Sequence, residues 1–484
     1  MNDIVIIGNG MAGSRLVTEI RARDREVPLT VFGAETQQPY NRVLLSNVLA
    51  GIARPDQIGL VDPAWYGRND VDARLGVQVE RIDRDAGVVH ASDGTATPYG
   101  TLVIATGSTS FVPPFPGTED GLPEGAVAFR TLDDCHAILD AAEGAGRAVV
   151  VGGGLLGIEA ARGLAGRGLE VTVVHLAGHL MERQLDPGAG RVLARTLGRL
   201  GIRAHLDANV SGLRTEAGRV TGVELATGES LPADLVVMAC GVRPETGLAR
   251  DAGLKVERGI VIDGTLRSVT DPSVRAIGEC SQHDDTVYGL VAPCWEQATV
   301  LADLLTGADA GARFTGARQI TRLKAASVDL VAMGETHFGD DDPDVEVMHF
   351  ADASRGTYKK VAIRRDRVVG AILLGETSTA GTLTQLYDRE APLPSDRLSL
   401  FFPGVGGAQA ADSPVRMPDA ATVCQCNNVS KGQIRACWEK GARTVGEVAE
   451  GTRASTGCGG CRDAVEGIVA WLDEQDSVSA QRSA

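Results

Sequence analysis

Residues 3–13 read DIVIIGNGMAG, an apolar run that enters a glycine-rich turn ahead of a segment with helical periodicity. The pattern predicts a β-strand, a tight turn and an α-helix. Gly8 permits the sharp turn, Gly10 lets the backbone approach a pyrophosphate, and Gly13 allows the helix to pack closely on the strand. The N-terminus of the helix then faces the anion. The sequence therefore predicts a dinucleotide-binding turn here.

The residues that follow sharpen this interpretation. A second apolar strand, residues 29–32, precedes Glu35, which stands about 20 residues beyond the last glycine, where an acid can hold a ribose hydroxyl. The loop at residues 38–47 carries Arg42 and several side-chain amides, which fits either a wrap around a cofactor or a surface loop with a solvated arginine. Residues 101–108, TLVIATGS, predict a buried strand, and the small residues at its carboxyl end leave room for a ligand.

The opening pattern then repeats. A proline-rich connector at residues 111–117 leads to AVVVGGGLLG at residues 148–157, a helix at 158–164 and a strand at 171–174. Two dinucleotide turns imply two dinucleotides, one held permanently and one exchanged. His175 stands where an acid would select NAD, so the sequence does not distinguish NADH from NADPH.

A cysteine cluster lies near the C-terminus: Cys424 and Cys426, then Cys458 and Cys461. Four thiolates can hold a zinc ion or a [2Fe–2S] cluster. The C-x-C spacing is unusual for structural zinc, which favours iron–sulfur and keeps zinc as the alternative. The other cysteines form no close pair, which argues against a redox-active dithiol.

Two capping boxes predict two short helices between the paired cysteines, one from Ser430 with Gln433 and one from Thr444 with Glu447. Gly451 is expected to close the second of these helices.

The length, charge and hydropathy of the chain limit the functions that it can have. The chain has 484 residues and a formal net charge of −16, so several domains are expected and nucleic acid is an unfavourable partner. No apolar run is long enough to cross a membrane, and no secretory signal is recognised, so we expect a cytoplasmic protein.

The predicted fold class is α/β with two Rossmann-like dinucleotide-binding domains, a small α+β domain and a small helical cluster domain. The expected boundaries are 1–113 with 244–308 for the first dinucleotide, 114–243 for the second, 314–400 for an interface domain and 420–475 for the cluster. Residues 405–417 are expected to form a linker.

Six stretches carry a resemblance to a known family: IVIIGNGMAG, PYNRVLLS, LVIATGS, VVVGGGLLGIEAA, VVMACGVRP and AIGEC. Their order resembles that of FAD-dependent pyridine-nucleotide reductases, especially the flavoprotein half of NAD(P)H nitrite reductases and the electron-transfer subunits of assimilatory nitrate reductases. The tail is similar to bacterioferritin-associated ferredoxin, whose four cysteines bind [2Fe–2S]. The sirohaem half of the nitrite reductases is not expected in this chain.

The resemblance implies three sets of site residues. The FAD set is Gly8, Gly10, Met11, Ala12, Gly13, Glu35, Asn41, Arg42, Ser46, Val79, Ala105, Thr106, Gly107, Gly278, Glu279 and Pro293. The NAD(P) set is Gly152, Gly154, Leu155, Leu156, Gly157, Glu159, His175 and Gly241, with Glu159 also a candidate near the flavin. The cluster set is Cys424, Cys426, Cys458 and Cys461. A lysine that many relatives carry near the flavin is replaced by Asn47.

The expected function is electron transfer from NAD(P)H through FAD and [2Fe–2S] to a partner, either a molybdenum nitrate reductase or a sirohaem nitrite reductase. One alternative is a self-contained flavin reductase of the ferredoxin or rubredoxin type. Another is a zinc-bearing, nucleotide-binding interaction protein. The sequence identifies neither the final acceptor nor the oligomeric state, and it does not say whether the cluster domain moves.

Overall fold

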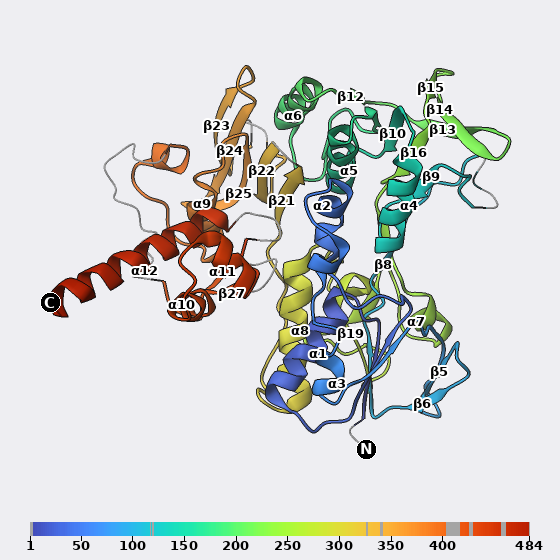
Figure 1. Ribbon diagram of the computed structural model, residues 1–484, viewed down its shortest axis with the longest axis vertical. Coiled ribbons are helices and arrows are strands. Elements are labelled where there is room, and N and C mark those ends of the chain that lie inside the picture. Colours follow the sequence, from blue (N-terminus) through green and yellow to red (C-terminus); the bar gives the residue numbers. More distant parts are fainter. Residues whose placement is uncertain are drawn as a thin grey trace. The chain divides into compact units, whose positions relative to one another are not determined.

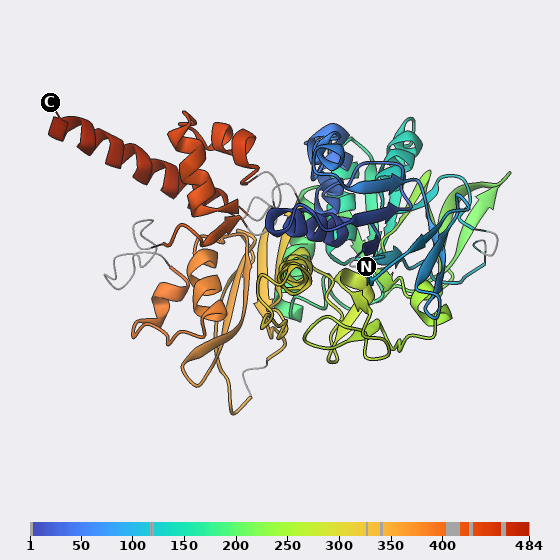
Figure 2. The same cartoon turned by 90° about the horizontal axis from the view of Figure 1, so that it is seen from below.

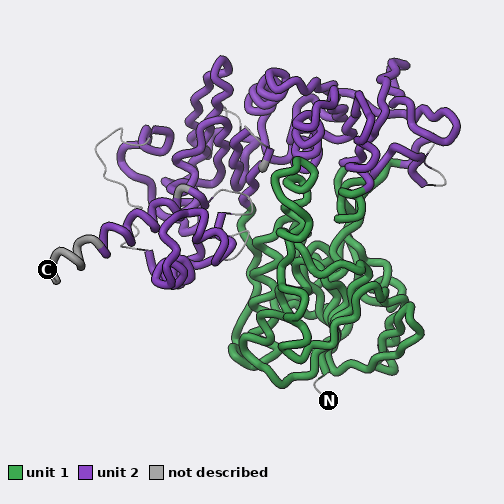
Figure 3. Tube along the Cα trace, in the orientation of Figure 1, with its two compact units in different colours: residues 1–113, 128–136, 240–319 green, residues 114–127, 137–239, 320–484 purple. Residues whose placement is uncertain are grey.

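A computed structural model describes residues 3–116, 118, 121–325, 328–338, 342–402, 417–424, 429–455 and 461–483. The chain forms two compact units (Figure 3). Unit 1 comprises residues 1–113, 128–136 and 240–319, and unit 2 comprises residues 114–127, 137–239 and 320–484. Unit 1 is therefore assembled from three separate stretches of chain.

The main sheet of unit 1 is parallel, with the strand order β19-β7-β1-β2-β3, and β19 is labelled in Figure 1. Its strands are β1 (Ile4–Ile7), β2 (Leu29–Gly33), β3 (Asp72–Leu75), β7 (Thr101–Ile104) and β19 (Val274–Ala276). Ile4 aligns with Leu29 on one side and Thr101 on the other. Every residue of β1 is buried, as expected for a parallel strand inside an α/β unit. Helices α1 (Met11–Arg23) and α8 (Val291–Thr306) pack against each other.

Shorter elements complete unit 1. An antiparallel sheet contains β4 (Val79–Asp83), β5 (Val88–Ala91) and β6 (Ala96–Pro98). The two-stranded pairs are β8 (Ser108–Ser110) with β17 (Val242–Pro244) and β18 (Ile260–Ile262) with β20 (Ser281–His283). The helices are η1 (Arg42–Leu44), α2 (Leu45–Leu49), η2 (Pro55–Ile58), α3 (Trp65–Arg68), α7 (Gly247–Asp251) and η3 (Gly278–Cys280).

The first part of unit 2 repeats the architecture with the strand order β12-β11-β10-β16-β9. These strands are β9 (Ala126–Ala128), β10 (Arg147–Val151), β11 (Glu170–Val174), β12 (Ile202–His205) and β16 (Leu235–Met238). Its helices are α5 (Leu155–Gly166) and α6 (Pro187–Arg199), while α4 (Leu132–Ala142) begins within unit 1. A smaller antiparallel sheet holds β13 (Val210–Glu216), β14 (Arg219–Leu225) and β15 (Ser230–Pro232).

The next part of unit 2 is an antiparallel sheet of order β21-β22-β25-β24-β23 (Figure 2, orange). Its elements are β21 (Ile320–Ala325), β22 (Val328–Gly334), β23 (Glu346–Asp352), β24 (Thr357–Arg364), β25 (Arg367–Leu374), α9 (Ala380–Asp388) and η4 (Arg397–Leu400). An antiparallel sheet with a helix agrees with the predicted small α+β domain. Residues 403–416, which hold most of the expected linker, lie outside the described residues.

The C-terminal part contains β26 (Thr422–Cys424), β27 (Val429–Ser430), α10 (Lys431–Glu439), α11 (Val445–Thr452) and α12 (Arg462–Ser483). Both predicted capping boxes are present. The prediction that Gly451 closes α11 is wrong, because the helix runs through it to Thr452. Arg453 takes the left-handed conformation that ends the helix, with φ of 65°. In the described part of the chain, no helix combines the length and apolar character needed to cross a membrane.

Candidate functional site

The turn between β1 and α1 has no room for side chains on its inner side. A Cβ at Gly8 would lie 2.2 Å from the carbonyl oxygen of Ala105, and a Cβ at Gly13 would lie 1.9 Å from the carbonyl oxygen of Gly8. A Cβ at Gly10 would meet nothing within 4 Å. Gly10 is also the N-cap of α1, and no side chain caps the helix there. The turn therefore leaves open space and uncapped N–H groups at a helix N-terminus, the arrangement that binds a pyrophosphate.

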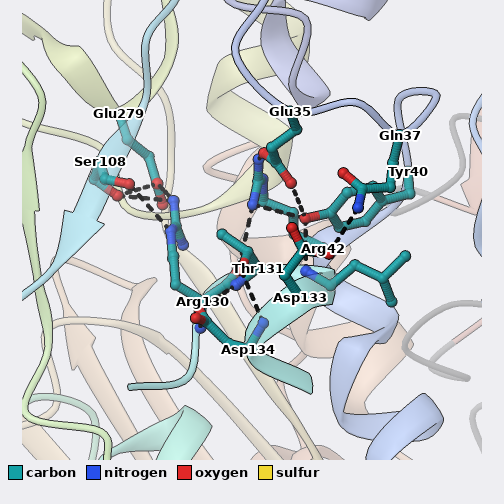
Figure 4. A network of polar contacts seen from close by, with 11 residues as sticks. Glu35, Gln37, Tyr40, Arg42, Ser108, Arg130, Thr131, Asp133, Asp134 and Glu279 are labelled. Atoms are coloured by element: carbon teal, nitrogen blue, oxygen red, sulfur yellow. Dashed lines mark hydrogen bonds and ion pairs between the residues drawn. The ribbon is translucent and has the colours of Figure 1, made fainter. Parts of the chain in front are cut away.

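Three side chains meet where β2 ends (Figure 4). The hydroxyl of Tyr40 donates to Glu35 at 2.6 Å, and Arg42 forms an ion pair with the same carboxylate. Arg42 also donates to the Tyr40 oxygen at 3.0 Å. Burial of Tyr40 raises the pKa of its phenol well above the usual value, so this residue stays a neutral donor. Glu35 and Arg42 thus lie together, as the cofactor-wrap interpretation requires of this loop.

A second group joins Ser108, the first residue of β8, to Glu279 in η3 (Figure 4). The hydroxyl of Ser108 donates to Glu279 at 2.6 Å, and Arg130 forms an ion pair with that carboxylate. Arg130 also donates to the Ser108 oxygen at 2.8 Å. Sequence reasoning missed Arg130, which lies in the stretch 128–136 that the structure groups with unit 1. An isolated arginine ahead of a helix start carries no signal of its own.

The remaining residues of the predicted FAD set also lie in unit 1. Met11 and Ala12 form the first turn of α1, and Ala12 lies close enough to Gly278 that a Cβ there would be 2.9 Å away. Thr106 donates its hydroxyl to the carbonyl of Glu245 at 2.7 Å. Asn41 caps η1, Val79 and Pro293 are buried in β4 and α8, and Gly107 has a φ of 74°.

Buried polar atoms in unit 1 supply a test of whether FAD fits these residues. The hydroxyl of Ser46 is buried and has no hydrogen-bond partner among the described residues. The same holds for the amide nitrogen of Asn9, which lies in the glycine turn itself. Unsatisfied buried groups are costly, and a polar ligand would satisfy them. Together with the open turn at Gly10, these atoms fit a bound dinucleotide.

Two thiols lie near the second group, Cys280 and Cys294. Both are free and buried, and burial raises the pKa of each. Cys280 donates to the carbonyl of Ile277 at 3.3 Å, and Cys294 donates to that of Leu290 at 3.2 Å. A thiol held in the protonated form is a poor nucleophile, so these residues act as buried fillers.

The turn between β10 and α5 has the geometry of the first turn. A Cβ at Gly157 would lie 1.9 Å from the carbonyl oxygen of Gly152, and a Cβ at Gly154 would meet nothing within 4 Å. Gly154 is the N-cap of α5, again without a side-chain cap. Leu155 and Leu156 form the first turn of α5, and Glu159 is buried in it. Gly241 belongs to unit 1, so the structure does not group it with this second turn.

His175, the residue after β11, is buried and bonded through both ring nitrogens. Its Nδ1 accepts the backbone N–H of Gly153 at 3.0 Å, and its Nε2 lies 2.9 Å from the carboxylate of Glu182. Since Nδ1 accepts, Nε2 must carry the proton that is donated to Glu182. Sequence reasoning did not connect Glu182 with this position.

The cysteine cluster is only partly described, because Cys426 and Cys458 lie outside the described residues. Cys424 and Cys461 are both buried in the small core of this region. The backbone N–H of Ser455 donates to Cys461 Sγ at 3.2 Å, as N–H groups do to the thiolates of iron–sulfur sites. No group of three or more metal-ligating side chains occurs within the described ranges, which omit half of this set.

Comparison with family models identifies three matches. Residues 2–298 match the pyridine nucleotide-disulphide oxidoreductase family, residues 320–391 match the rubredoxin NAD⁺ reductase C-terminal domain, and residues 422–471 match the BFD-like [2Fe–2S] binding domain. The last match covers all four predicted cluster ligands.

Individual proteins agree with these matches. The chain is 38% identical to an NAD(P)H nitrite reductase of Bacillus subtilis over 99% of its own length and 59% of that protein. It is 34% identical to the assimilatory nitrate reductase electron transfer subunit of the same organism, over 98% of this chain and 60% of that one. The chain therefore spans less than two thirds of either relative. The covalent putidaredoxin reductase–putidaredoxin complex aligns with a TM-score of 0.72 and 26% identity, covering 80% of this chain and 93% of that chain.

Proposed function

The chain belongs to the pyridine nucleotide-disulphide oxidoreductase family, and we propose that it is an FAD-dependent NAD(P)H oxidoreductase that delivers electrons to a separate reductase. The favoured partner is the molybdenum-containing catalytic subunit of an assimilatory nitrate reductase, and a sirohaem nitrite reductase is the second choice. The observation that carries this proposal is the presence of two open glycine turns in a chain that also matches a [2Fe–2S] domain. When bound, FAD would supply the hydride-accepting and one-electron-donating chemistry that links NAD(P)H to a [2Fe–2S] cluster.

The residues of unit 1 would hold FAD. The uncapped N-terminus of α1 at Gly10 would bind its pyrophosphate, and Glu35 would accept a ribose hydroxyl. Glu279, positioned by Ser108 and Arg130, supplies acceptors for the hydroxyls of the ribityl chain. In unit 2, the uncapped N-terminus of α5 would bind the nicotinamide nucleotide in the same way. These residues bind and orient, and the hydride step requires no side-chain acid or base.

The four cysteines are the proposed ligands of the cluster. Cys424 and Cys461 come from a buried core, so their thiolates would be shielded from solvent. The match to a [2Fe–2S] domain favours iron over the zinc alternative.

The experiment replaces one cluster ligand. Cys458→Ala should keep flavin reduction by NAD(P)H in an anaerobic stopped-flow measurement but lose electron delivery to the purified catalytic partner. Cys437→Ala is the matched control, because Cys437 lies on α10, outside the predicted ligand set. Full delivery by the Cys458 variant would rule out the cluster as a relay.

A second candidate is a self-contained flavin reductase that serves a small electron carrier. The match of residues 320–391 to a rubredoxin reductase domain favours it. Under this function the Cys458 variant would reduce rubredoxin or ferredoxin as fast as the wild-type protein does. Carrier reduction that falls together with the iron content would instead favour the relay.

A further inference from the structure

The acid that usually binds the ribose of NAD is absent from its place after β11, and the carboxylate of Glu182 lies beside the histidine that occupies that place. In dinucleotide-binding units that acid follows the second strand and accepts the 2′-hydroxyl of NAD. Here His175 follows β11, and its ring donates a hydrogen bond to Glu182, which comes seven positions later in the chain. We propose that Glu182 is the residue that selects NADH over NADPH, with His175 as its positioning residue. This inference rests on the proposed oxidation of a nicotinamide nucleotide at this turn.

The imidazole of His175 is fixed in one orientation. The side chain of His175 is 10% exposed, and its ring lies against the glycine turn, since a Cβ at Gly153 would be 2.7 Å from the ring. The N–H of Gly153 fixes the tautomer by donating to Nδ1. The imidazole therefore presents one N–H, and Glu182 accepts it.

The backbone around Glu182 is hydrogen-bonded to the same turn. The N–H of Met181 donates to the carbonyl of Gly153 at 2.9 Å, and Met181 has a φ of 54°, unusual for a non-glycine residue. On the other side, the ring of His337 lies 2.7 Å from the carbonyl oxygen of Glu182. These two hydrogen bonds hold residues 181–182 so that Glu182 lies near the glycine turn between β10 and α5.

The carboxylate of Glu182 can accept further hydrogen bonds from a ligand. The side chain of Glu182 is 38% exposed, and one N–H from His175 leaves most of its lone pairs available. A ribose 2′-hydroxyl can donate to such an oxygen. A 2′-phosphate has no proton to donate at neutral pH and carries like charge, so its approach is opposed.

The charged groups around Glu182 also bear on the choice of nucleotide. Asp207 follows β12 and lies near Gly178, adding a second negative charge beyond β11. His179 is engaged with the carbonyl of Leu185 at 3.0 Å. Arg183 is exposed and is the nearest cation in sequence, so it is the group that a 2′-phosphate would use. The balance favours the nucleotide without that phosphate.

The test measures binding of NAD⁺ and NADP⁺ to the FAD-loaded full chain by calorimetry. The wild-type protein should prefer NAD⁺ by at least about tenfold, and the preference should shrink as salt is raised. Glu182→Gln should bind NADP⁺ roughly tenfold more tightly and NAD⁺ less than about threefold more weakly. His175→Asn should change the ratio in the same direction, and thermal unfolding should show that both variants remain folded. Glu170→Gln, at the opposite end of β11, is the matched control and should keep the wild-type ratio.

The outcomes separate this inference from the proposed function. Equal affinities in the wild-type protein, or a ratio unchanged by Glu182→Gln, would overturn the inference alone. A preference for NADP⁺ that disappears in Arg183→Gln would also overturn it. Failure of both nucleotides to bind or to reduce the flavin would overturn the proposed function, and this inference with it.

Discussion

Asp186 and Lys360 form a buried ion pair within unit 2, with 2.9 Å between Oδ2 and Nζ. The same carboxylate accepts the hydroxyl of Tyr358 at 2.7 Å, and its other oxygen caps α6 by accepting the N–H of Ala189 at 2.8 Å. Lys360 donates further to the carbonyl of Thr336 at 3.2 Å. One acid therefore joins the start of α6 to strand β24, and the pair has the extra hydrogen bonds that a buried charge needs.

Replacing Lys360 with methionine should destabilise this junction. Removing one partner of a buried pair costs about 3–5 kcal/mol, because the other charge is left buried without compensation. Amide hydrogen exchange in the first turns of α6 should accelerate about 100-fold or more. Arg203→Met is the control, since Arg203 pairs with Glu170 on an exposed face and such pairs contribute about 1 kcal/mol at most. Equal exchange in the two variants would contradict the prediction.

The same junction should respond to acid. Burial opposes ionisation of Asp186, but the N–H of Ala189 and the groups of Lys360 and Tyr358 outweigh it, so its pKa lies below the usual value. A group with a lowered folded-state pKa stabilises the protein above its unfolded pKa and loses that contribution as the pH falls through the folded value. The stability of the α6 region should therefore fall below about pH 4. Asp186→Asn should flatten this acid limb, and parallel limbs in the two proteins would be evidence against the role of Asp186.

The glycine turns could be predicted from sequence because their signal is local. Gly8, Gly10 and Gly13 lie within six positions, and the close contacts that require glycine are made largely within that stretch and to Ala105. The same reasoning found the second turn and both capping boxes. It failed at Gly451, where the preference for glycine at a helix end was overridden by Arg453 in the left-handed conformation.

The partners of the site acids could not be predicted, because they depend on how distant segments return. Arg130 meets Glu279 across 149 positions of sequence, in a stretch that folds with unit 1. Glu182 is only seven positions from His175, but the hydrogen bond between Met181 and Gly153 decides where it lies. The hydrophobic periodicity and the glycine spacing of the sequence do not indicate the hydrogen bond between Met181 and Gly153. The predicted cluster site also includes Cys426 and Cys458, which lie outside the described residues.

Replacing Arg130 with methionine should weaken FAD retention. The change leaves Glu279 half-buried without its cation and removes a donor from Ser108, so we expect roughly ten- to hundredfold weaker binding. The measurement is flavin fluorescence released on serial dilution of the holoprotein. Arg68→Met is the control, because Arg68 forms an exposed ion pair with Asp62 in the same unit. Identical release curves for the two variants would show that Arg130 does not support the cofactor.

Two neighbouring glycines of the second turn should separate folding from binding. A Cβ at Gly157 would lie 1.9 Å from the carbonyl oxygen of Gly152, so Gly157→Ala must displace α5 from β10 and should lower the thermal midpoint of unit 2. A Cβ at Gly154 has no neighbour within 4 Å, so Gly154→Ala should fold normally. Its methyl group would occupy the space in front of the α5 N-terminus and should weaken nicotinamide nucleotide binding by about tenfold or more. FAD content, set by unit 1, should be unchanged in Gly154→Ala and serves as the internal control. Normal nucleotide affinity in Gly154→Ala would mean that the open space at this turn is not the binding site.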